Sequence, residues 1–441
     1  MSAWLWIIAT LLAVAALGWV FRAGGRWVTG NAPRFRDMSY GEAFGFALAA
    51  AALAGGTWLY LQPGAVFFRW AVQGFVIFAV AAYLFRELGR LIGTEGTRKL
   101  FRQMPLTAAF GILVILVYSF VAIFAGQISL RTVIIVAVVG MILTEIVRRN
   151  TGDAAATGFG GLVFAVNLVF VVMYLVGPIA PHGQEQVFEL ANVVAGGDPA
   201  LGGNPDFPLG TDQIGRDILS RLIFGAQNTV GIAFVTTLLA FFLGGTLGLL
   251  AATLGGWLDQ LLSRGVDVLM AIPSLIFALL LMTIAAVWAP QTGIPLTYFM
   301  IVIIAVIDST RVFRLARAVG INIVVMDYIE AAKLRGEGLG YLVFREILPN
   351  ATAPLLAEFG LRFCFVFLTI AALSFLGVGI QPPLADWGTM VRDLAAFINY
   401  AQFAPMAAVT PLLAAGAIAL LTVGVNFVVD WMLQKSSGLK E

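Results

Sequence analysis

The sequence predicts an all-α protein that crosses a membrane many times. Hydrophobic residues make up 60% of the 441 residues and charged residues only 11%, whereas a soluble domain has about 25% charged residues. The apolar residues form stretches of about 20 residues, which is the length of a helix that spans the hydrocarbon core. Backbone groups in lipid must find their hydrogen-bond partners within the segment, so these stretches are expected to be helices.

Five apolar stretches precede residue 153. The first has no basic segment before it and no cleavage site of the kind that signal peptides carry, so it is expected to stay as a helix. The fifth is short for a span and contains Glu145, so whether it crosses fully is left open. The five stretches are residues 3–21, 44–61, 67–85, 106–125 and 132–147.

Six further stretches follow, which gives about eleven spans. Between the first and second of them the chain leaves the membrane, and Ile214, Ile218, Leu219, Leu222 and Ile223 recur at helical spacing there. A short amphipathic helix at the outer surface is expected at these residues. The six stretches are residues 160–179, 229–252, 266–288, 298–318, 353–378 and 406–433.

The basic residues indicate how the chain is oriented, because positively charged loops stay in the cytoplasm. Lysine and arginine gather in alternate loops, such as residues 22–36 and 86–102. This alternation predicts an external N-terminus and a cytoplasmic C-terminus. The loops on the other side hold few basic residues, namely Arg69, Arg131, Arg216, Arg221 and Arg392.

Residues 327–350 form the longest polar, helix-prone break between two spans. Strong helix formers occupy positions 330–335, and Gly336 then interrupts them. Pro349 disfavours the α conformation at Leu348, so the second helical piece is expected to stop or kink there. The stretch therefore predicts two short helices joined by a turn, with Glu330 within the first turn or so of its helix and Gly336 at the junction, where the chain needs either a positive φ or a close backbone approach.

This stretch resembles the EAA loop of membrane subunits in binding-protein-dependent ABC importers. The resemblance implies that the loop forms the coupling helix, which binds in a groove on the cytoplasmic ATPase. The matching residues are Glu330, Ala331, Ala332, Gly336, Ile347, Leu348 and Pro349.

Two more stretches resemble the second membrane subunit of dipeptide, oligopeptide and nickel importers. They are residues 208–221 and residues 373–383 with the Trp-Gly pair that follows at 387–388. In that family these outer loops face the binding protein, which implies such a role for Asp212, Arg216, Gln381, Pro382, Pro383 and Trp387.

The resemblance covers roughly residues 159–441 and implies a type I importer core of six helices. It divides the chain into a first core helix with its external loop and amphipathic helix (154–225), a transmembrane domain (226–434) and a cytoplasmic tail (435–441). Residues 1–153 remain as an N-terminal extension with about five spans, either an accessory module or a lateral helical wrapping. Residues 151–153 are interpreted as a linker, so a chain that begins near Arg148 is expected to insert and assemble.

The same resemblance implies the partners. The chain would form half of a translocation pathway in a bacterial inner membrane, with a second, related membrane subunit, two ATPases and a periplasmic substrate-binding protein. The cargo would be short peptides or nickel. ATP and magnesium would bind to the ATPase subunits, and this chain would bind no cofactor.

The chain shows no site for catalysis or for a metal ion. It has no phosphate-binding loop and no recognisable hydrolase motif, so it is not expected to be an enzyme. Its single cysteine, Cys364, excludes a disulfide within the chain, and its single histidine, His182, is expected at the surface. A net charge of +2 is too small to indicate nucleic-acid binding.

A secondary transporter or channel that works alone is the alternative function. Such a protein should show internal repeats and ionisable residues well inside its spans. The sequence shows no repeat, and its few charges within spans are expected near helix ends. Glu358 and Arg362 are spaced to pair on one helix face, as are Asp308 and Arg311, and each pair is either structural or part of the translocation path.

Small residues predict a helix contact in the middle of the chain. Glycines at spacings of three and four residues let two helix backbones approach closely in lipid. The sequence therefore predicts a packing face at Gly244, Gly245, Gly248, Gly255 and Gly256.

Overall fold

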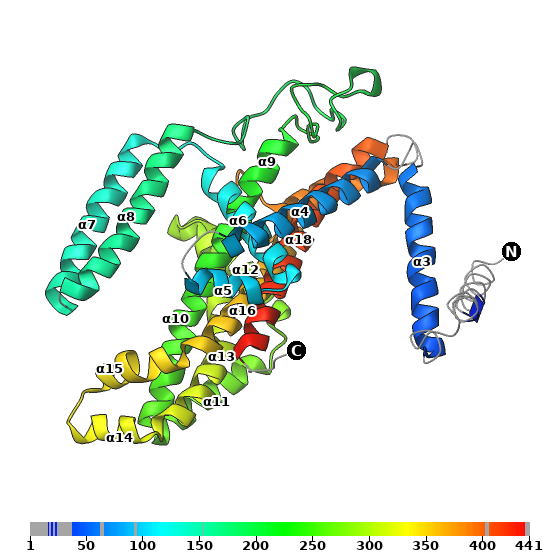
Figure 1. Ribbon diagram of the computed structural model, residues 1–441. Coiled ribbons are helices and arrows are strands. Elements are labelled where there is room, and N and C mark those ends of the chain that lie inside the picture. Colours follow the sequence, from blue (N-terminus) through cyan, green and yellow to red (C-terminus); the bar gives the residue numbers. More distant parts are fainter. Residues whose placement is uncertain are drawn as a thin grey trace. The chain divides into compact units, whose positions relative to one another are not determined.

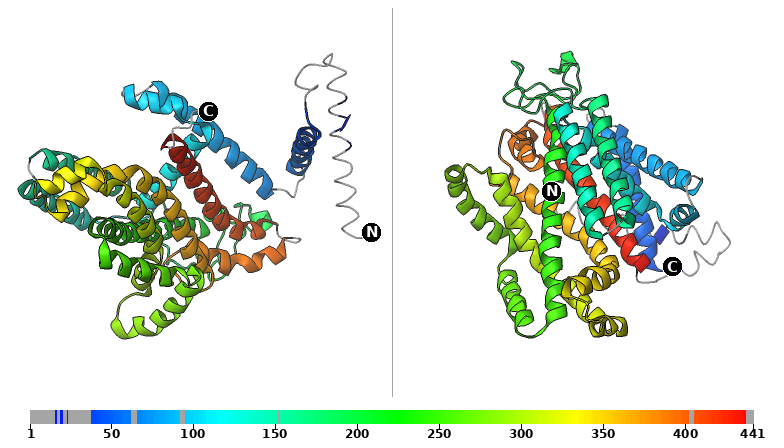
Figure 2. Two further views of the ribbon diagram at one scale, coloured as in Figure 1. Left: turned by 90° about the horizontal axis from the view of Figure 1, so that it is seen from below. Right: turned by 90° about the vertical axis from the view of Figure 1, so that its left-hand side faces the viewer.

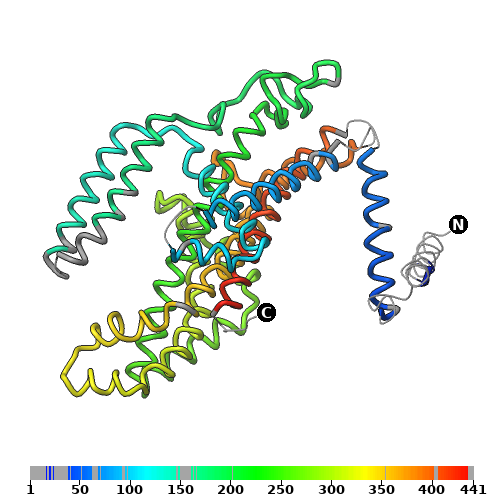
Figure 3. Tube along the Cα trace, in the orientation of Figure 1, coloured from blue at the N-terminus to red at the C-terminus, as the bar shows by residue number. Residues whose placement is uncertain are grey.

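The computed structural model describes residues 38–61, 66–91, 95–151, 153–401 and 405–436, together with residues 16, 19, 20 and 23. Figure 3 follows these residues in colour along the Cα trace. Within them every regular element is a helix, and β pairing is limited to isolated bridges. Outside the described residues lie most of the expected span at residues 3–21, the basic residues Arg22, Arg26, Arg34 and Arg36, and both chain ends.

The chain divides into two compact units, residues 1–76 and 77–441. The first unit contains α3 (Tyr40–Leu61) and the start of α4 (Val66–Leu91). Ser39 and Glu42 form a reciprocal cap before α3: the Ser39 N–H donates to Glu42 Oε2 at 2.7 Å, and the Glu42 N–H donates to Ser39 Oγ at 3.2 Å.

The second unit holds the remaining helices, which Figure 1 labels along the chain. The part before residue 218 contains α5 (Glu95–Gln103), α6 (Leu106–Phe124), α7 (Leu130–Thr151), α8 (Asp153–Val176) and the 3₁₀ turn η1 (Pro199–Leu201). The rest contains α9 (Ile218–Gly225), η2 (Ala226–Val230), α10 (Gly231–Leu254), α11 (Gly256–Met270), α12 (Ser274–Thr292), α13 (Leu296–Val324), α14 (Asp327–Leu334), α15 (Leu339–Tyr341), η3 (Leu342–Ile347), α16 (Leu348–Phe375), α17 (Trp387–Leu394), η4 (Ala395–Tyr400) and α18 (Pro405–Ser436).

Eight helices in the described part of the chain are long and apolar enough to cross a membrane. They agree with eight of the eleven expected spans. Helix α7, which covers the doubtful stretch 132–147, is not among them, and α8 contributes only the shorter apolar piece Val166–Val176. The protein is thus a multi-span helical membrane protein, while the number eleven stays a prediction.

The expected span at residues 266–288 is present but lies later in the chain than the sequence suggests. The chain breaks at residues 271–273, between α11 and α12, and the apolar span is Ser274–Thr292. Pro273 precedes the first residue of α12, where its missing N–H costs no helix bond. Helix α11 carries Asp259, Arg264 and Asp267, and none of its residues is buried.

The expectation of a separate amphipathic helix near residues 214–223 is wrong. Helix α9 begins at Ile218 but continues through the π turn η2 into α10, so residues 218–254 form one helical run of 37 residues. Gly225 keeps helical backbone angles and lies against the Trp387 ring, where an added Cβ would come within 2.4 Å of Cδ1.

Helices α10 and α13 pack along each other through small residues. A Cβ on Gly244 would lie 2.3 Å from the Ser309 carbonyl oxygen, and one on Gly248 would lie 2.6 Å from that of Phe313. The predicted packing face is therefore confirmed at these two glycines. Gly245 faces open space, and Gly255 and Gly256 instead have φ of 62° and 63°, where α10 ends and α11 begins.

Helix α6 packs just as closely on α18. A Cβ on Gly111 would lie 2.2 Å from the Gly424 carbonyl oxygen. The Tyr118 hydroxyl donates to the Ala417 carbonyl at 2.9 Å. Part of the N-terminal extension therefore shares the main hydrophobic core with the segment after residue 218.

Candidate functional site

The segment between α13 and α16 forms a compact helical projection. Helix α14 follows α13 after a two-residue turn, and α15 and η3 lead into α16. Figures 1 and 2 show α14 and α15 at one end of the second unit, opposite the long irregular segment that precedes α9. The predicted pair of short helices joined by a turn is present.

A small hydrophobic core fixes this projection to the spans. Ile329 and Ala332 of α14 and Ile347 of η3 are completely buried. They pack in one cluster with Leu249 of α10 and Ala316 of α13. Ala332 and Ile347, two residues of the EAA-like pattern, therefore hold the loop in place and are not available to a partner.

The turn of the loop has the geometry expected of Gly336. Its φ is +79°, and the next N–H, that of Glu337, donates to the Ala332 carbonyl at 3.2 Å. This is the left-handed helix ending that glycine favours. Glu330 lies in the first turn of α14, as the sequence predicts.

The chain does not leave the helix at Pro349. Helix α16 starts at Leu348, with Pro349 in its first turn, directly after the π segment η3. The stop or kink expected from the proline is therefore absent, and the helix instead changes from π to α at this point. Pro349 fits there because a proline in the first turn of an α-helix removes no hydrogen bond of that helix.

The exposed side of the projection carries the rest of the EAA-like pattern. Glu330, Ala331, Gly336 and Pro349 are exposed, and Leu348 is half-buried. Sequence reasoning missed Leu334, whose exposed fraction is 84%. An isolated leucine in a helical pattern carries no signal that it faces outward, so only the structure identifies it.

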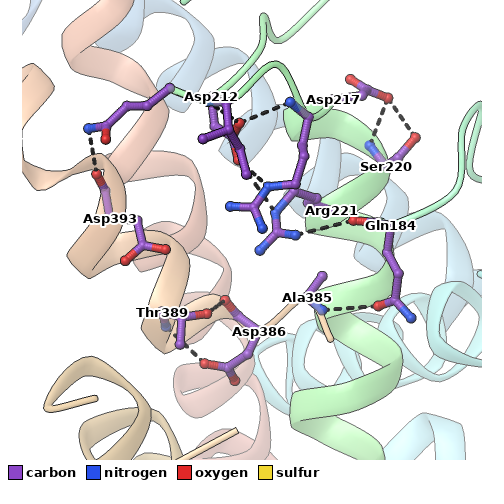
Figure 4. A network of polar contacts seen from close by, with 12 residues as sticks. Gln184, Asp212, Asp217, Ser220, Arg221, Ala385, Asp386, Thr389 and Asp393 are labelled. Atoms are coloured by element: carbon purple, nitrogen blue, oxygen red, sulfur yellow. Dashed lines mark hydrogen bonds and ion pairs between the residues drawn. The ribbon is translucent and has the colours of Figure 1, made fainter. Parts of the chain in front are cut away.

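At the other end of α16, polar contacts join residues 184–229 to residues 381–393; we call this set of contacts the polar junction (Figure 4). Asp212 lies within it and is only 6% exposed. Its Oδ2 accepts from Arg216 Nε at 2.6 Å, and its Oδ1 accepts from the Arg216 N–H at 2.9 Å. Asp212 and Arg216 therefore shape their own turn.

Asp386 is the second carboxylate of the polar junction. Its Oδ1 accepts from the Thr229 hydroxyl at 2.8 Å, and its Oδ2 accepts from the Thr389 N–H at 2.9 Å. Burial raises the pKa of the Asp386 carboxyl, and these hydrogen bonds oppose that rise. Gln184 Oε1 accepts from Asn228 Nδ2 at 3.0 Å and from the Ala385 N–H at 3.0 Å, which ties the loop after α8 to the same turn.

Trp387 lies buried beside the polar junction. It is 2% exposed, and its Nε1 donates to the Leu222 carbonyl at 2.9 Å. Its ring meets that of Tyr118 edge to face at 5.5 Å. Of the residues predicted to face a binding protein, only Pro382 and Pro383 are exposed, and Gln381 and Arg216 are half-buried. That role remains a prediction for them.

Sequence reasoning missed Gln184, Asn228, Thr229 and Asp386. A weak signal existed for Asp386, because aspartate is a favoured residue at a helix N-cap, and Asp386 caps α17. The other three reach their partners across more than 150 residues of chain, which no local pattern reveals.

A cluster of four charges lies between α13 and α16. Glu358 Oε1 is 2.7 Å from Arg362 Nε, which confirms the predicted pair. Asp308 Oδ1 is 3.5 Å from Arg311 Nη1 and 3.8 Å from Arg362 Nη1. These charges stand in the middle of their helices, so the expectation that they lie near helix ends is wrong.

Within the part of the chain that the structure describes, no group of three or more His, Cys, Asp or Glu residues could hold a metal ion. His182 is partly buried and lies 3.1 Å from Asp217 Oδ2 through Nδ1. Asp217 also caps α9 by accepting from the N–H groups of Leu219 and Ser220. The expected surface histidine is therefore a structural contact of the loop after α8.

Comparisons with known proteins agree with this architecture. The sequence pattern of the family described as binding-protein-dependent transport system inner membrane component matches residues 244–436. The chain is 34% identical over 247 residues to the dipeptide transport system permease protein DppC of Haemophilus influenzae, across 55% of this chain and 79% of that protein.

Two further relatives give the same result. The chain is 35% identical over 283 residues to the di/tripeptide transport system permease protein DppC of Pseudomonas aeruginosa, across 63% of this chain and 89% of that protein. It is 31% identical over 271 residues to the glutathione transport system permease protein GsiD of Pectobacterium atrosepticum, across 61% and 83%. The chain therefore belongs to the family of inner membrane components of binding-protein-dependent transport systems.

Proposed function

We propose that this chain is a permease subunit of an ABC importer of short peptides and that it forms half of the translocation pathway. The observation that carries the proposal is the helical projection between α13 and α16, which is anchored by buried residues and presents Glu330, Leu334 and Gly336 outward. The names of the three relatives, which concern dipeptides, di- and tripeptides and glutathione, support peptides as the cargo.

In this proposal the chain itself does no chemistry. Two ATPase subunits bind ATP and magnesium, and their closure moves α14, which transmits the movement to α13 and α16. A second, related permease completes the pathway, and an external binding protein delivers the peptide to the ends of the helices near Pro382 and Pro383. The loop 327–350 is cytoplasmic in this arrangement.

The test is reconstitution of the native complex, purified through a tag on this chain, in proteoliposomes with ATP inside. Uptake of radiolabelled alanyl-alanine that requires both ATP and the binding protein is the expected result. Uptake of nickel ions in place of the dipeptide would assign the other cargo that the family allows. Purification of the chain without ATPase subunits, combined with uptake driven by an ion gradient, would contradict the proposal in favour of a secondary transporter.

A further inference from the structure

A cavity of about 160 Å³ lies between α12, α13 and α16. Its lining is mixed, and the polar residues in it are Ser274, Asp308, Arg311 and Thr369. One water molecule needs only about 10–15 Å³ measured in this way. The cavity therefore has room for part of a small solute within the span.

Asp308 lines the cavity and, within the described part of the chain, has one acceptor atom without a donor. The residue is only 6% exposed, and its Oδ2 is buried without a hydrogen-bond partner among the described residues. Its other oxygen, Oδ1, faces the two arginines at 3.5 and 3.8 Å. A buried carboxylate oxygen without a donor is costly, and ionisable groups within spans are commonly functional.

The two arginines of the cluster differ in how firmly they are held. Arg362 is buried between Glu358, at 2.7 Å, and the ring of Phe365, whose centroid is 4.7 Å from Cζ. Arg311 has a side chain that is 39% exposed, and its nearest charge, Asp308, is 3.5 Å away. Arg362 is thus paired with Glu358, although its Nε and Nη1 lack a well-aligned hydrogen bond to any described residue. Asp308 and Arg311 both line the cavity and contact each other only at 3.5 Å, so a ligand in the cavity can reach this pair.

We propose that Asp308 and Arg311 form a transient binding site for the charged ends of a zwitterionic peptide on its way through the membrane. The peptide ammonium group donates to Asp308 Oδ2, and its carboxylate accepts from the Arg311 guanidinium, which matches carboxylate geometry. The charges of Asp308 and Arg311 are opposite to those of the peptide ammonium and carboxylate groups that they meet, so the net charge of the occupied site is zero. The inference rests on the proposed function, because it takes the cavity as part of the peptide pathway.

The test compares Asp308→Asn with Glu358→Gln in the full complex in nanodiscs, without the binding protein. Both changes are nearly isosteric and remove one negative charge from the same cluster, but Glu358 does not line the cavity. Equilibrium dialysis measures binding of radiolabelled alanyl-alanine and of N-acetyl-alanyl-alanine, which lacks the ammonium group. Wild type and Glu358→Gln should bind the free dipeptide about ten-fold or more tightly than the acetylated form, since a hydrogen bond to a charged group contributes that much.

In Asp308→Asn this preference should fall to within about two-fold. A purely structural role for Asp308 would weaken both ligands equally or lower the unfolding midpoint while the preference persists, and either result would overturn the site. Loss of the second permease from Asp308→Asn with an unchanged preference would assign Asp308 to the subunit interface instead. If wild type takes up alanyl-alanine in proteoliposomes but shows no preference in dialysis, only the site fails; if it takes up no peptide, the proposed function fails as well.

Discussion

At the scale of residues, two glycines in the loop between α13 and α16 differ in backbone conformation. Gly336 has φ +79°, while Gly338, two residues later, has φ −74° and ψ 162°. Neither would meet a neighbouring atom within 4 Å if a Cβ were added. Any difference between valine at the two positions therefore comes from backbone strain, because β-branched residues avoid positive φ.

Gly336→Val should weaken ATPase docking, whereas Gly338→Val should not. The strain of about 1–3 kcal/mol corresponds to roughly five- to 150-fold weaker coupling. Retention of ATPase subunits and binding-protein-stimulated ATP hydrolysis measure the effect in complexes with equal amounts of both permeases. Equal activity of the two variants would contradict the role of the loop, and so would normal uptake by Glu330→Lys.

At the scale of elements, two ion pairs that differ in exposure join α11 to the C-terminal half of α13. Arg317 Nη2 lies 2.7 Å from Asp259 Oδ2, and the Asp259 side chain is largely covered. Arg314 pairs with Asp267, where both side chains are more than half exposed. Exposed pairs contribute little, so the Asp259 pair should hold α11.

The pH dependence of this contact follows from Asp259. The hydrogen bond from Arg317 holds the pKa of the Asp259 carboxyl below its ordinary value. Between the two pKa values, the Asp259 carboxyl binds more protons when its contact with Arg317 is broken than when the contact is formed. The contact therefore stabilises the position of α11 above about pH 4, and this stabilisation is lost as the pH falls through the lowered pKa. Hydrogen exchange of the α11 amides, corrected for intrinsic rates, should show protection that falls in acid.

Asp259→Asn should produce the acid-like exchange of α11 already at pH 7, and Asp267→Asn is the matched control with unchanged exchange. Protection of α11 that is the same in all three proteins from pH 7 to pH 3 would show that the ion pair does not hold the helix.

Elements whose formation depends on neighbouring residues in the sequence could be predicted, whereas those that depend on distant contacts could not. Apolar length predicted eight spans, and the loop 327–350 was predictable because glycine and helix formers act locally. The break before α12 and the continuation of α9 into α10 were not, although Pro273 stands at the break and Gly225 lies within the continuous run. Trp387 reaches Leu222 across 165 residues of chain, so its burial in the polar junction could not be foreseen.

At the scale of the whole molecule, the structure questions where the N-terminal extension ends. The sequence places the boundary at residue 153, but α6 packs on α18 through Gly111 and Gly424 and contributes Phe110 and Val114 to the core. A chain that begins at residue 95 keeps these contacts, whereas one that begins at residue 148 loses them.

The shorter chain should therefore be less stable than the one that begins at residue 95. Loss of a few large buried contacts costs several kcal/mol, which corresponds to a fall in unfolding midpoint of roughly 5–15 °C. Thermal unfolding of the purified complexes measures this difference. Equal midpoints and equal yields of assembled complex would show that α6 is a lateral addition, as the sequence alone suggests.

The orientation of the chain gives a separate prediction. Single cysteines at positions 2 and 438, in a chain with Cys364→Ala, should be labelled from opposite sides of the membrane by an impermeant thiol reagent. Position 2 should react from outside and position 438 only after the membrane is opened. Two cytoplasmic ends would mean an even number of spans, with residues 132–147 as the segment that does not cross.

The contact between α6 and α18 also has a consequence during synthesis. The Tyr118 hydroxyl and the Ala417 carbonyl are 299 positions apart in the chain. At about 5–20 residues per second, the ribosome needs roughly 15–60 s to make the chain between them. Throughout that time the glycine face of α6 must be covered by lipid or by another helix. The contact between the two helices can form only after α18 has been made.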